Sequence, residues 1–258
     1  MNEGLEEGAR VLVLFKNGKK SLHLLTKKGI HTHRGYLTFE QVSSSGYGSR
    51  LTTNLGEEVF ILRPTFSEIV SKIARRTQIV YPKEIGYALV KLGIESGSKV
   101  LEVGSGSGAT TIFLASIVKP SGKVVSIDVS EESLRIASEN LKKFSLLDYV
   151  DLRLTDVRSG IEEKNFFDAA FIDIPEPWMA FETLSSALKP SSRVAIVVPT
   201  YNQLVKLSEN LPSNFVFYEA VDIILQEIQV KKGAVRPLPL ARAHNAFLVF
   251  LVNIKELA

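Results

Sequence analysis

The chain of 258 residues contains no cysteine. Disulfide bonds, thiolate nucleophiles, iron–sulfur clusters and cysteine-based zinc sites are therefore excluded, and a reducing intracellular compartment is expected. The first eight residues, MNEGLEEG, contain three glutamates and lack the basic start and apolar run of a secretory signal. The longest apolar run, Ala246 to Val252, is too short to span a bilayer. These absences predict a cytoplasmic protein that does not enter a membrane.

A large excess of charge is also missing, since 31 basic and 28 acidic side chains leave a net charge of +3. Residues 1–83 nevertheless contain 13 Lys and Arg against 7 Asp and Glu, and residues 84–258 contain 18 against 21. A basic first third is compatible with an anionic partner but does not require one. His31 and His33 alternate along a predicted strand, but no third ligand is nearby in the sequence, so we expect no metal site.

Short apolar segments separated by turn residues fill residues 1–64. They read VLVLF, SLHLLT, IHTH, YLTFEQV and EEVFILRP, with Asn17-Gly18 as a hairpin turn and SSSGYGS as a loop. This pattern predicts a small antiparallel β module. Thr65 is expected to cap a helix that runs to about Arg75, and residues 65–98 are interpreted as a linking helix and connector.

Strands and helices alternate in residues 99–258. Strands are predicted at KVLEVG, KVVSID, VDLRL, FDAAFID and RVAIVVP, and helices near 110–118, 131–144 and 179–188. The strands are β-branched runs without solvent alternation, which is typical of a parallel sheet covered on both faces. Two further strands, FVFYEAVDIIL and NAFLVFLVNI, flank the basic loop QVKKGAVRPLPLARAH. The predicted fold class is α/β, with a mostly parallel, Rossmann-like sheet and a small N-terminal β domain.

The segment VLEVGSGSGATT places Gly104, Gly106 and Gly108 between a predicted strand and a helix. Glycines there permit a tight turn and bring backbone N–H groups at the helix start close to a ligand. The loop and Asp128 also fit the dinucleotide fingerprint loosely. The motif alone therefore does not separate a nicotinamide cofactor from S-adenosylmethionine.

The carboxylate of Glu102 favours S-adenosylmethionine, whereas Asp128 fits either cofactor. Glu102 lies two residues before the first glycine, where its charge would repel a pyrophosphate but attract the α-ammonium group of S-adenosylmethionine. Asp128 ends the second strand and can accept hydrogen bonds from ribose hydroxyls. Asp156 follows the next strand and is the expected neighbour of the adenine ring. The structural alternatives are a solvated strand end for Glu102 and a helix cap or turn for Asp156.

The second motif is FIDIPEPW, which follows the strand FDAAFI. Asp173 is expected at the same sheet edge as the glycine loop, because the carboxyl ends of parallel strands line one crevice. Pro175 and Pro177 stiffen the turn, which suits a positioned base. A helix-capping role is the alternative for Asp173. Trp178 either stacks on a base or cation or anchors the following helix.

These motifs carry a family resemblance. The order ExGxGxG, an acidic strand end and DxPEPW, preceded by RRTQIVYPKE and a small β module, resembles the tRNA adenine-N1 methyltransferase family, which modifies the T-loop adenosine at tRNA position 58. The resemblance covers nearly the whole chain, and YPKE together with IDIPEPW is its most specific part. It implies S-adenosylmethionine as the cofactor, tRNA as the substrate, one antiparallel strand near the sheet edge and a homotetramer. Some archaeal members also modify position 57.

The resemblance assigns the catalytic role to Asp173 and makes Tyr81 a wall of the target-base pocket. Cofactor contacts are implied for Gln78, Ser107, Gly108, Ala109, Thr110, Asp128, Ser133 and Asp156. The expected cofactor site also includes Glu102, Gly104, Ser105, Gly106 and Asp173. Adenine N1 is a weak nucleophile, and an Asp173 carboxylate bonded to the N6 amine would offset the positive charge that develops on the base. This chemistry needs no metal.

The C-terminal loop departs from the family pattern. Arg236-Pro237 is kept, but His244-Asn245-Ala246 replaces the usual His-Thr-Gly, and a tryptophan often found before Arg-Pro is absent. RNA contacts are expected from Arg75, Arg76, Arg236, Arg242, His244, Lys19-Lys20, Lys27-Lys28 and Lys231-Lys232. Any of these groups also fits an ordinary solvated surface. Tyr81 and Tyr201 are expected to hold the extruded base by stacking.

Two alternatives remain open from the sequence. One is a methyltransferase of the same fold that acts on a small molecule or a protein. The other is a non-catalytic tRNA-binding subunit of a methyltransferase pair. Such a subunit should have lost the glycine loop or the catalytic aspartate, and both are present here.

Overall fold

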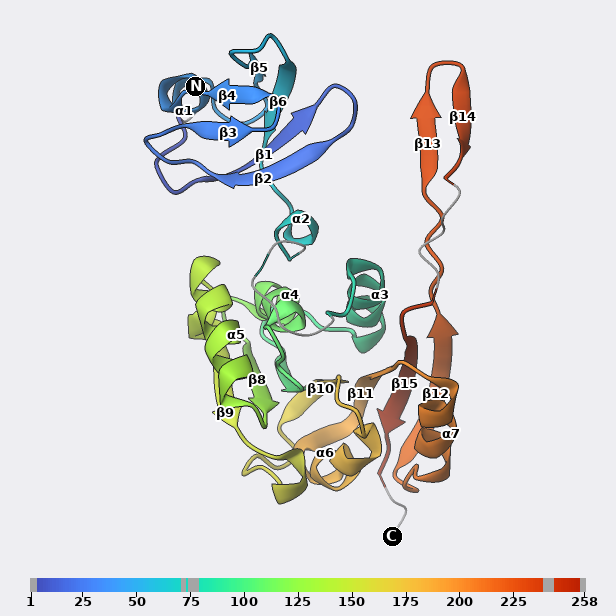
Figure 1. Ribbon diagram of the computed structural model, residues 1–258. Coiled ribbons are helices and arrows are strands. Elements are labelled where there is room, and N and C mark those ends of the chain that lie inside the picture. The colour runs from blue at the N-terminus through green and yellow to red at the C-terminus, as the bar shows by residue number, and fades with distance from the viewer. Residues whose placement is uncertain (1–3, 71–72, 74–78, 239–243, 256–258) are drawn as a thin grey trace. The chain divides into compact units, whose positions relative to one another are not determined.

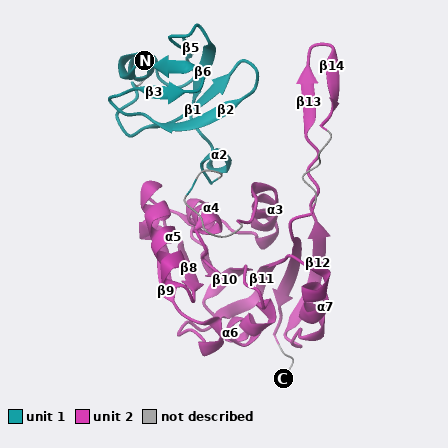
Figure 2. Ribbon diagram, viewed as in Figure 1, with its two compact units in different colours: residues 1–73 teal, residues 74–258 magenta. Residues whose placement is uncertain are grey.

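The computed structural model describes residues 4–70, 73, 79–238 and 244–255. The chain divides into two compact units, Met1–Ile73 (unit 1) and Ala74–Ala258 (unit 2), which Figure 2 shows in different colours. The break at residue 73 divides the predicted connector, residues 65–98, between the units. None of the described helices is long and apolar enough to cross a membrane.

Unit 1 is built mainly from short antiparallel strands. Four of them form a sheet in the order β2-β1-β6-β5, and β3 pairs with β4 in a separate hairpin. The strands are β1 (Arg10–Phe15), β2 (Lys20–Leu24), β3 (Ile30–Thr32), β4 (Gly35–Leu37), β5 (Arg50–Thr52) and β6 (Glu58–Leu62). Alternate residues of β1 and β6, namely Val11, Val13, Phe15, Val59 and Ile61, share one core. This alternation follows from the two-residue side-chain period of a strand.

Residues 39–45 form a helix, so the strand and loop predicted there are wrong. The helix α1 (Phe39–Ser45) begins after Thr38, whose hydroxyl accepts a hydrogen bond from Gln41 N at 3.2 Å. The Gln41 side chain in turn accepts from Thr38 N at 2.8 Å. This reciprocal pair is a capping box, which satisfies two N–H groups at the helix start. Val42 then packs into the core of unit 1.

The central sheet of unit 2 has seven strands in the order β12-β15-β11-β10-β7-β8-β9 (Figure 1). Its strands are β7 (Lys99–Val103), β8 (Lys123–Asp128), β9 (Val150–Leu154), β10 (Phe167–Ile172), β11 (Leu188–Val198), β12 (Phe215–Asp222) and β15 (Phe247–Asn253). Only β15 runs against its neighbours, since it pairs antiparallel with both β11 and β12. The predicted mostly parallel sheet is confirmed.

Helices cover both faces of this sheet. They are α3 (Pro82–Leu92), α4 (Ala109–Val118), α5 (Glu131–Lys143), α6 (Phe181–Ala187) and α7 (Tyr201–Glu209), whereas the short helix α2 (Phe66–Val70) belongs to unit 1. The 3-10 turns are η1 (Leu147–Tyr149), η2 (Val157–Ser159) and η3 (Pro177–Ala180). Helices α3, α4 and α5 lie on one face, and α6 and α7 on the other (Figure 1). Leu101, Ile127 and Ile196 of the sheet share a buried cluster with Leu184 of α6 and Leu207 of α7.

The predicted basic loop between the last two strands contains a hairpin. Strands β13 (Ile228–Lys231) and β14 (Ala234–Pro237) pair antiparallel, with Val230 opposite Val235. Nearly all residues of both strands are exposed. Strand β13 alternates apolar and polar residues over four positions, which is at the lower limit for recognising a strand, and the hairpin buries neither face.

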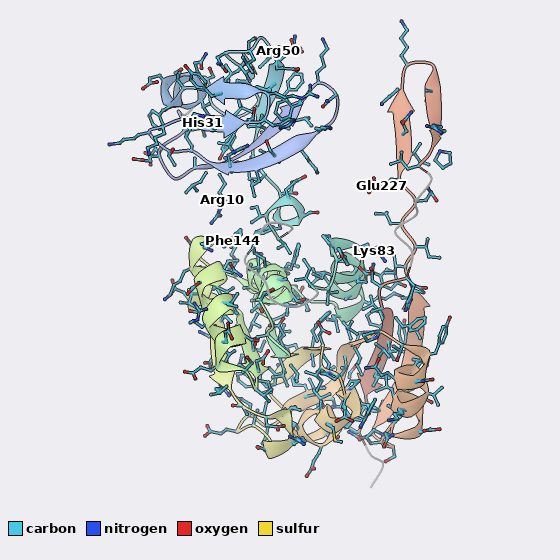
Figure 3. The ribbon with its side chains drawn as sticks, viewed as in Figure 1. Arg10, His31, Arg50, Lys83, Phe144 and Glu227 are labelled. Atoms are coloured by element: carbon cyan, nitrogen blue, oxygen red, sulfur yellow. The ribbon has the colours of Figure 1, made fainter. Side chains whose placement is uncertain are left out.

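Helix α3 was not recognised in the sequence, although Pro82 and Gly93 are typical start and end signals. Its first turn is bonded to the C-terminal strands. The buried Lys83 Nζ donates to Ile223 O at 2.5 Å and lies 2.5 Å from Glu84 Oε1 (Figure 3). Asn245 also donates to Glu84 Oε1 at 3.5 Å. These contacts join the YPKE segment to the end of β12 and the start of β15.

Candidate active site

A cavity of about 560 Å³ opens at the carboxyl ends of β7, β8, β9 and β10. Its lining consists of Ile79, Val80, Val103–Ser107, Ala109, Thr110, Ile127–Val129, Ser133, Thr155–Arg158, Asp173–Glu176 and Met179. All of these residues belong to unit 2. Ligands of open parallel sheets bind at this edge, and the volume suits a small-molecule ligand.

The glycine loop turns between β7 and α4. Gly104 and Gly108 have φ angles of +96° and +78°, which L side chains rarely adopt. A Cβ on Gly104 would overlap the carbonyl oxygen of Asp173, and a Cβ on Gly108 would lie 3.1 Å from Ala137 Cα. Gly104 therefore lets the loop contact the turn after β10, and Gly108 lets α4 pack closely on α5.

Asp128 is held in the cavity wall by two backbone donors. Gly106 N donates to Oδ2 at 2.9 Å, and Ser130 N donates to Oδ1 at 2.8 Å. Each carboxylate oxygen retains a further lone pair that can accept a hydrogen bond from a ligand hydroxyl. The glycine loop and the end of β8 are thus fixed to each other through this side chain.

Asp173 follows β10 and lines the cavity. Its N–H donates to Val103 O at 2.9 Å, which bonds the turn to the neighbouring strand. Burial raises the pKa of the Asp173 carboxyl group to about 6. Within the described parts of the chain, no group donates a hydrogen bond to this carboxylate. A carboxyl group of this kind in a cavity is a candidate base or hydrogen-bond acceptor.

Glu102 lies beneath the cavity and does not line it, contrary to the expected contact with a ligand ammonium group. The side-chain period of β7 turns Glu102 toward the face that α4 covers. Its Oε2 accepts hydrogen bonds from Thr111 Oγ1 at 2.6 Å and Ser126 Oγ at 2.5 Å, and burial raises its pKa to about 8. Ser126 Oγ is also 2.6 Å from Ser105 Oγ, so Glu102 supports the glycine loop from below.

Asp156 lines the cavity, where a neighbour of the adenine ring was predicted. It is also the N-cap residue of η2, which is the helix cap that the sequence offered as the alternative. Its Oδ1 accepts from Arg158 N at 2.9 Å, and its Oδ2 lies 2.5 Å from Arg158 Nη2. The Arg158 side chain, with the backbone hydrogen bond, lowers the pKa of Asp156 to about 2. The carboxylate is therefore ionised and oriented at neutral pH.

The cavity brings together most of the predicted cofactor residues. Its lining contains Gly104, Ser105, Gly106, Ser107, Ala109, Thr110, Asp128, Ser133, Asp156 and Asp173. Gly108 is absent from the lining because it packs against α5. Gln78 lies outside the described residues.

Several lining residues are not among the predicted site residues. They are Ile79, Val80, Thr155, Ile174 and Met179. Ile79 and Val80 lie in the segment RRTQIVYPKE and Ile174 lies in FIDIPEPW, so their neighbours Gln78 and Asp173 could have indicated them, whereas Thr155 and Met179 belong to no motif. The apolar members, Ile79, Val80, Ile174 and Met179, give the cavity apolar walls, which suit a flat heterocycle.

Tyr81 is the N-cap residue of α3 and lies next to the lining residue Val80 without belonging to the lining. Its assignment to the target-base pocket stays a prediction. Tyr201 follows β11, one strand beyond β10, and His244 precedes β15, two strands beyond β10. Their ring centroids are 4.6 Å and 4.3 Å from that of Phe247. His244 also contacts Pro199 O at 2.9 Å through Nε2.

The predicted RNA contacts are spread over both units. Arg236 is exposed on β14, and Lys19, Lys27, Lys28, Lys231 and Lys232 are exposed as well. Lys20 pairs with Glu68 at 2.7 Å. Arg75, Arg76 and Arg242 lie outside the described residues. His31 stacks on Tyr36 with ring centroids 5.6 Å apart (Figure 3 labels His31).

The residues of the cavity fit S-adenosylmethionine. Ser107 Oγ is buried in the lining and has no hydrogen-bond partner within the described residues, so it can pair with a polar ligand group. Asp128 has acceptor capacity for ribose hydroxyls at the end of β8. Ile127, Val157 and Met179 supply apolar surface for a purine ring.

Comparison with known proteins identifies the family. The family model described as "tRNA methyltransferase complex GCD14 subunit" matches residues 57–250. A relative from Thermus thermophilus, named tRNA (adenine(58)-N(1))-methyltransferase TrmI, is 30% identical over 243 residues, which are 93% of this chain and 95% of the relative. The match therefore extends over both units.

Two solved structures are similar over their whole length. The tRNA (m1A58) methyltransferase TrmI from Aquifex aeolicus has a TM-score of 0.86 and 33% identity, covering 98% of this chain and 99% of its own. A SAM-dependent O-methyltransferase from Thermotoga maritima has a TM-score of 0.92 and 31% identity, covering 99% and 97%. The predicted S-adenosylmethionine-dependent methyltransferase fold is confirmed. The glycine loop, the cavity at the sheet edge and these similarities agree, and the chain belongs to the tRNA methyltransferase family of the GCD14 subunit.

Proposed function

We propose that this protein transfers a methyl group from S-adenosylmethionine to N1 of adenosine 58 in the T-loop of tRNA. The observation that carries the proposal is that Asp173, from the most family-specific motif, shares one cavity wall with the glycine loop and Asp128. The relatives named tRNA (adenine(58)-N(1))-methyltransferase TrmI and tRNA (m1A58) methyltransferase TrmI support it, because they match nearly the entire chain.

Different cavity residues would bind different parts of S-adenosylmethionine. S-adenosylmethionine, when bound, supplies an electrophilic methyl group on a sulfonium centre. Asp128 would accept hydrogen bonds from the ribose hydroxyls, and Asp156 would lie beside the adenine ring. The buried Ser107 hydroxyl would pair with a polar group of the cofactor. Because these groups are already hydrogen-bonded or packed in place, the ordering cost on binding is low.

Asp173 would act on the target base rather than on the methyl group. Its carboxylate accepts a hydrogen bond from the exocyclic N6 amine, which raises electron density at N1 and offsets the positive charge that N1 gains. A charge-assisted hydrogen bond contributes about 1.5 to 3 kcal/mol, or roughly tenfold to a hundredfold in rate. Alignment of the two substrates supplies a larger share.

The T-loop adenine is stacked inside folded tRNA, so it must be extruded to reach a carboxylate in a cavity. We propose that the rings of Tyr81 and Tyr201 hold the extruded base by stacking on it. The basic groups Arg236, Lys19-Lys20 and Lys27-Lys28 would contact phosphates. The same proposal of contacts with the RNA includes Arg75, Arg76, Arg242, His244 and Lys231-Lys232.

The family resemblance extends the proposal to assembly and location. We infer a homotetramer, since this is the assembly that the resemblance implies. A tRNA substrate together with the absence of cysteine supports a cytoplasmic location. The resemblance also raises methylation of position 57 as an additional reaction, which the experiment below separates from that at position 58.

The test is incubation of the purified protein with unmodified tRNA transcript and methyl-labelled S-adenosylmethionine, followed by nucleoside analysis and mapping. We expect label in 1-methyladenosine at position 58. A matched transcript with guanosine at position 58 should lose that label, and residual label at position 57 would reveal the second target. Transfer to a base other than adenine, or no transfer despite cofactor binding, would contradict the proposal.

A second function is supported by one neighbour. The similar structure from Thermotoga maritima is described as an O-methyltransferase, whose methyl acceptor would be a hydroxyl group. An enzyme of that type that acts on a small molecule or a protein would be insensitive to ribonuclease. Loss of label incorporation after ribonuclease treatment of the substrate therefore separates the two functions.

A further inference from the structure

The turn that carries Asp173 is held on two sides. On the β7 side, Asp173 N donates to Val103 O at 2.9 Å, and Gly104 packs against the Asp173 carbonyl. On the other side, Gln203 Nε2 of α7 donates to Pro175 O at 2.9 Å. Pro175 is two residues from Asp173, and its fixed φ couples movement of its carbonyl to the backbone of the turn.

The orientation of the Gln203 amide is set by its own helix. Thr200, the N-cap residue of α7, donates from Oγ1 to Gln203 Oε1 at 2.8 Å and accepts from Gln203 N at 3.3 Å. Because a hydroxyl donor occupies the amide oxygen, the amide NH₂ group faces the Pro175 carbonyl. The helix cap thus presents a donor of defined direction to the turn.

This bond has no substitute among the described residues. Asp173 N and Met179 N make the backbone hydrogen bonds that flank the turn, and no other described side chain donates to the backbone of residues 173–177. Pro175 and Pro177 lack N–H groups, so the turn cannot close on itself through them. Removal of the Gln203 donor would leave the α7 side of the turn without a hydrogen bond.

We propose that Gln203 is a positioning residue for the Asp173 carboxylate, acting through the Pro175 carbonyl. This inference rests on the proposed function of Asp173. Gln203 itself contacts neither the cavity nor a reacting atom, and it does not line the site. Its effect is therefore expected on the rate of methyl transfer and not on binding of cofactor or tRNA.

The test uses Gln203→Glu as the main variant. A carboxylate at position 203 has nearly the same shape and still accepts from Thr200 Oγ1, so the helix cap is kept, but it repels the Pro175 carbonyl instead of donating to it. We expect a two- to tenfold lower kcat, with KM for tRNA and Kd for S-adenosylmethionine unchanged. Gln203→Ala should show a similar loss.

Asn202→Ala is the matched control. Asn202 is exposed on the same helix turn and makes no side-chain hydrogen bond within the described residues. Its replacement should leave kcat and KM at the wild-type values. Equal losses in Asn202→Ala and Gln203→Glu, or a loss in Gln203→Glu that appears in Kd for S-adenosylmethionine, would overturn the positioning role.

Trp178 provides a readout that does not depend on tRNA. It is the only tryptophan of the chain and lies in η3, directly after the turn, with Lys206 Nζ 5.6 Å from the centre of its ring. A loosened turn should increase quenching of its fluorescence by acrylamide in Gln203→Glu but not in Asn202→Ala. Unchanged quenching in Gln203→Glu would overturn the inference.

The two readouts separate failure of the inference from failure of the proposed function. A wild-type protein that does not methylate tRNA contradicts the proposed function, while Trp178 quenching still decides whether Gln203 holds the turn. An active wild type with an unchanged kcat in Gln203→Glu contradicts the inference alone.

Discussion

At the scale of single residues, the Asp173 carboxyl group links pH to activity. Burial raises its pKa to about 6, and the ionised form is the stronger acceptor of a hydrogen bond from an amine and the form that offsets positive charge on the base. Lowering the pH through 6 therefore protonates the Asp173 carboxylate. At a pH one unit below the pKa, only about a tenth of the carboxyl groups are ionised. We expect methyl transfer at pH 5 to be roughly tenfold slower than at pH 8 under single-turnover conditions.

Asp173→Asn is the control for this pH dependence. The amide cannot ionise, so the variant should transfer the methyl group at least tenfold more slowly at pH 8. Its rate should also show no decrease with a midpoint near pH 6. Binding of S-adenosylmethionine should be retained. The assigned role would be contradicted by a variant that keeps the wild-type pH profile.

Glu102 links pH to stability. Its pKa in the folded protein is raised by burial to about 8, although Ser126 and Thr111 donate to it, whereas an unfolded chain has a value near 4.5. Between these two pH values the folded state keeps a proton on Glu102 that the unfolded state releases. The contribution of this proton to the free energy of unfolding is therefore complete below pH 4.5 and is lost as the pH rises toward 8. The loss is on the order of a few kcal/mol.

Glu102→Gln should remove this pH dependence, because its amide oxygen still accepts from Ser126 and Thr111 but carries no proton to lose. Thermal unfolding at pH 5 and pH 9 is the measurement. We expect the melting temperature of the variant to exceed that of the wild type at pH 9 by more than at pH 5. A difference that is the same at both pH values would show that Glu102 does not titrate in this range.

At the scale of elements, the glycine loop and the turn after β10 are placed by mutual contact. A Cβ at position 104 would overlap the Asp173 carbonyl, in addition to its unfavourable φ of +96°. Gly104→Ala is therefore expected to separate the two segments and to weaken S-adenosylmethionine binding at least tenfold, measured by calorimetry. The melting temperature should also fall.

Gly93→Ala is the matched control for Gly104→Ala. Gly93 has a φ of +65° at the end of α3, but a Cβ there meets open space. Its replacement costs about 1 kcal/mol of backbone strain and should leave cofactor affinity unchanged. If both variants lose the same affinity, backbone strain and not the contact with Asp173 is responsible.

At the scale of the whole molecule, each unit contains its own core. The core of unit 1 includes Val13 and Ile61, and that of unit 2 includes Leu101 and Ile196. The entire cavity lining belongs to unit 2, so S-adenosylmethionine should stabilise that unit alone. At 100 times Kd, the ligand adds about 2.7 kcal/mol, which corresponds to roughly 5 to 10 °C for a unit of this size.

Scanning calorimetry with and without S-adenosylmethionine measures this effect, and Trp178 fluorescence identifies the transition of unit 2. We expect S-adenosylmethionine to raise the temperature of the transition reported by Trp178 and to leave the temperature of a second transition, that of unit 1, unchanged. One transition that shifts as a whole would show that the two units unfold together.

The sequence by itself determined the features that depend on local pattern. The β-branched runs from residue 99 onward indicated a parallel sheet, and the glycine loop and Asp128 marked its ligand-binding edge. The position of Asp173 after its strand followed from the same rule, because strand ends in a parallel sheet meet at one edge. The helix α1 was predicted wrongly as a strand and a loop, although Thr38 and Gln41 have the spacing of a capping box.

Only the tertiary structure decided the features that depend on residues far apart in the chain. Glu102 is buried because α4 covers its face of β7, a contact that the motif ExGxGxG does not contain. The apolar lining residues Ile79 and Met179 and the bond from Gln203 to Pro175 likewise join segments that no local pattern connects. Periodicity specifies which face of an element is apolar, whereas the neighbour that covers that face is chosen when the elements pack together.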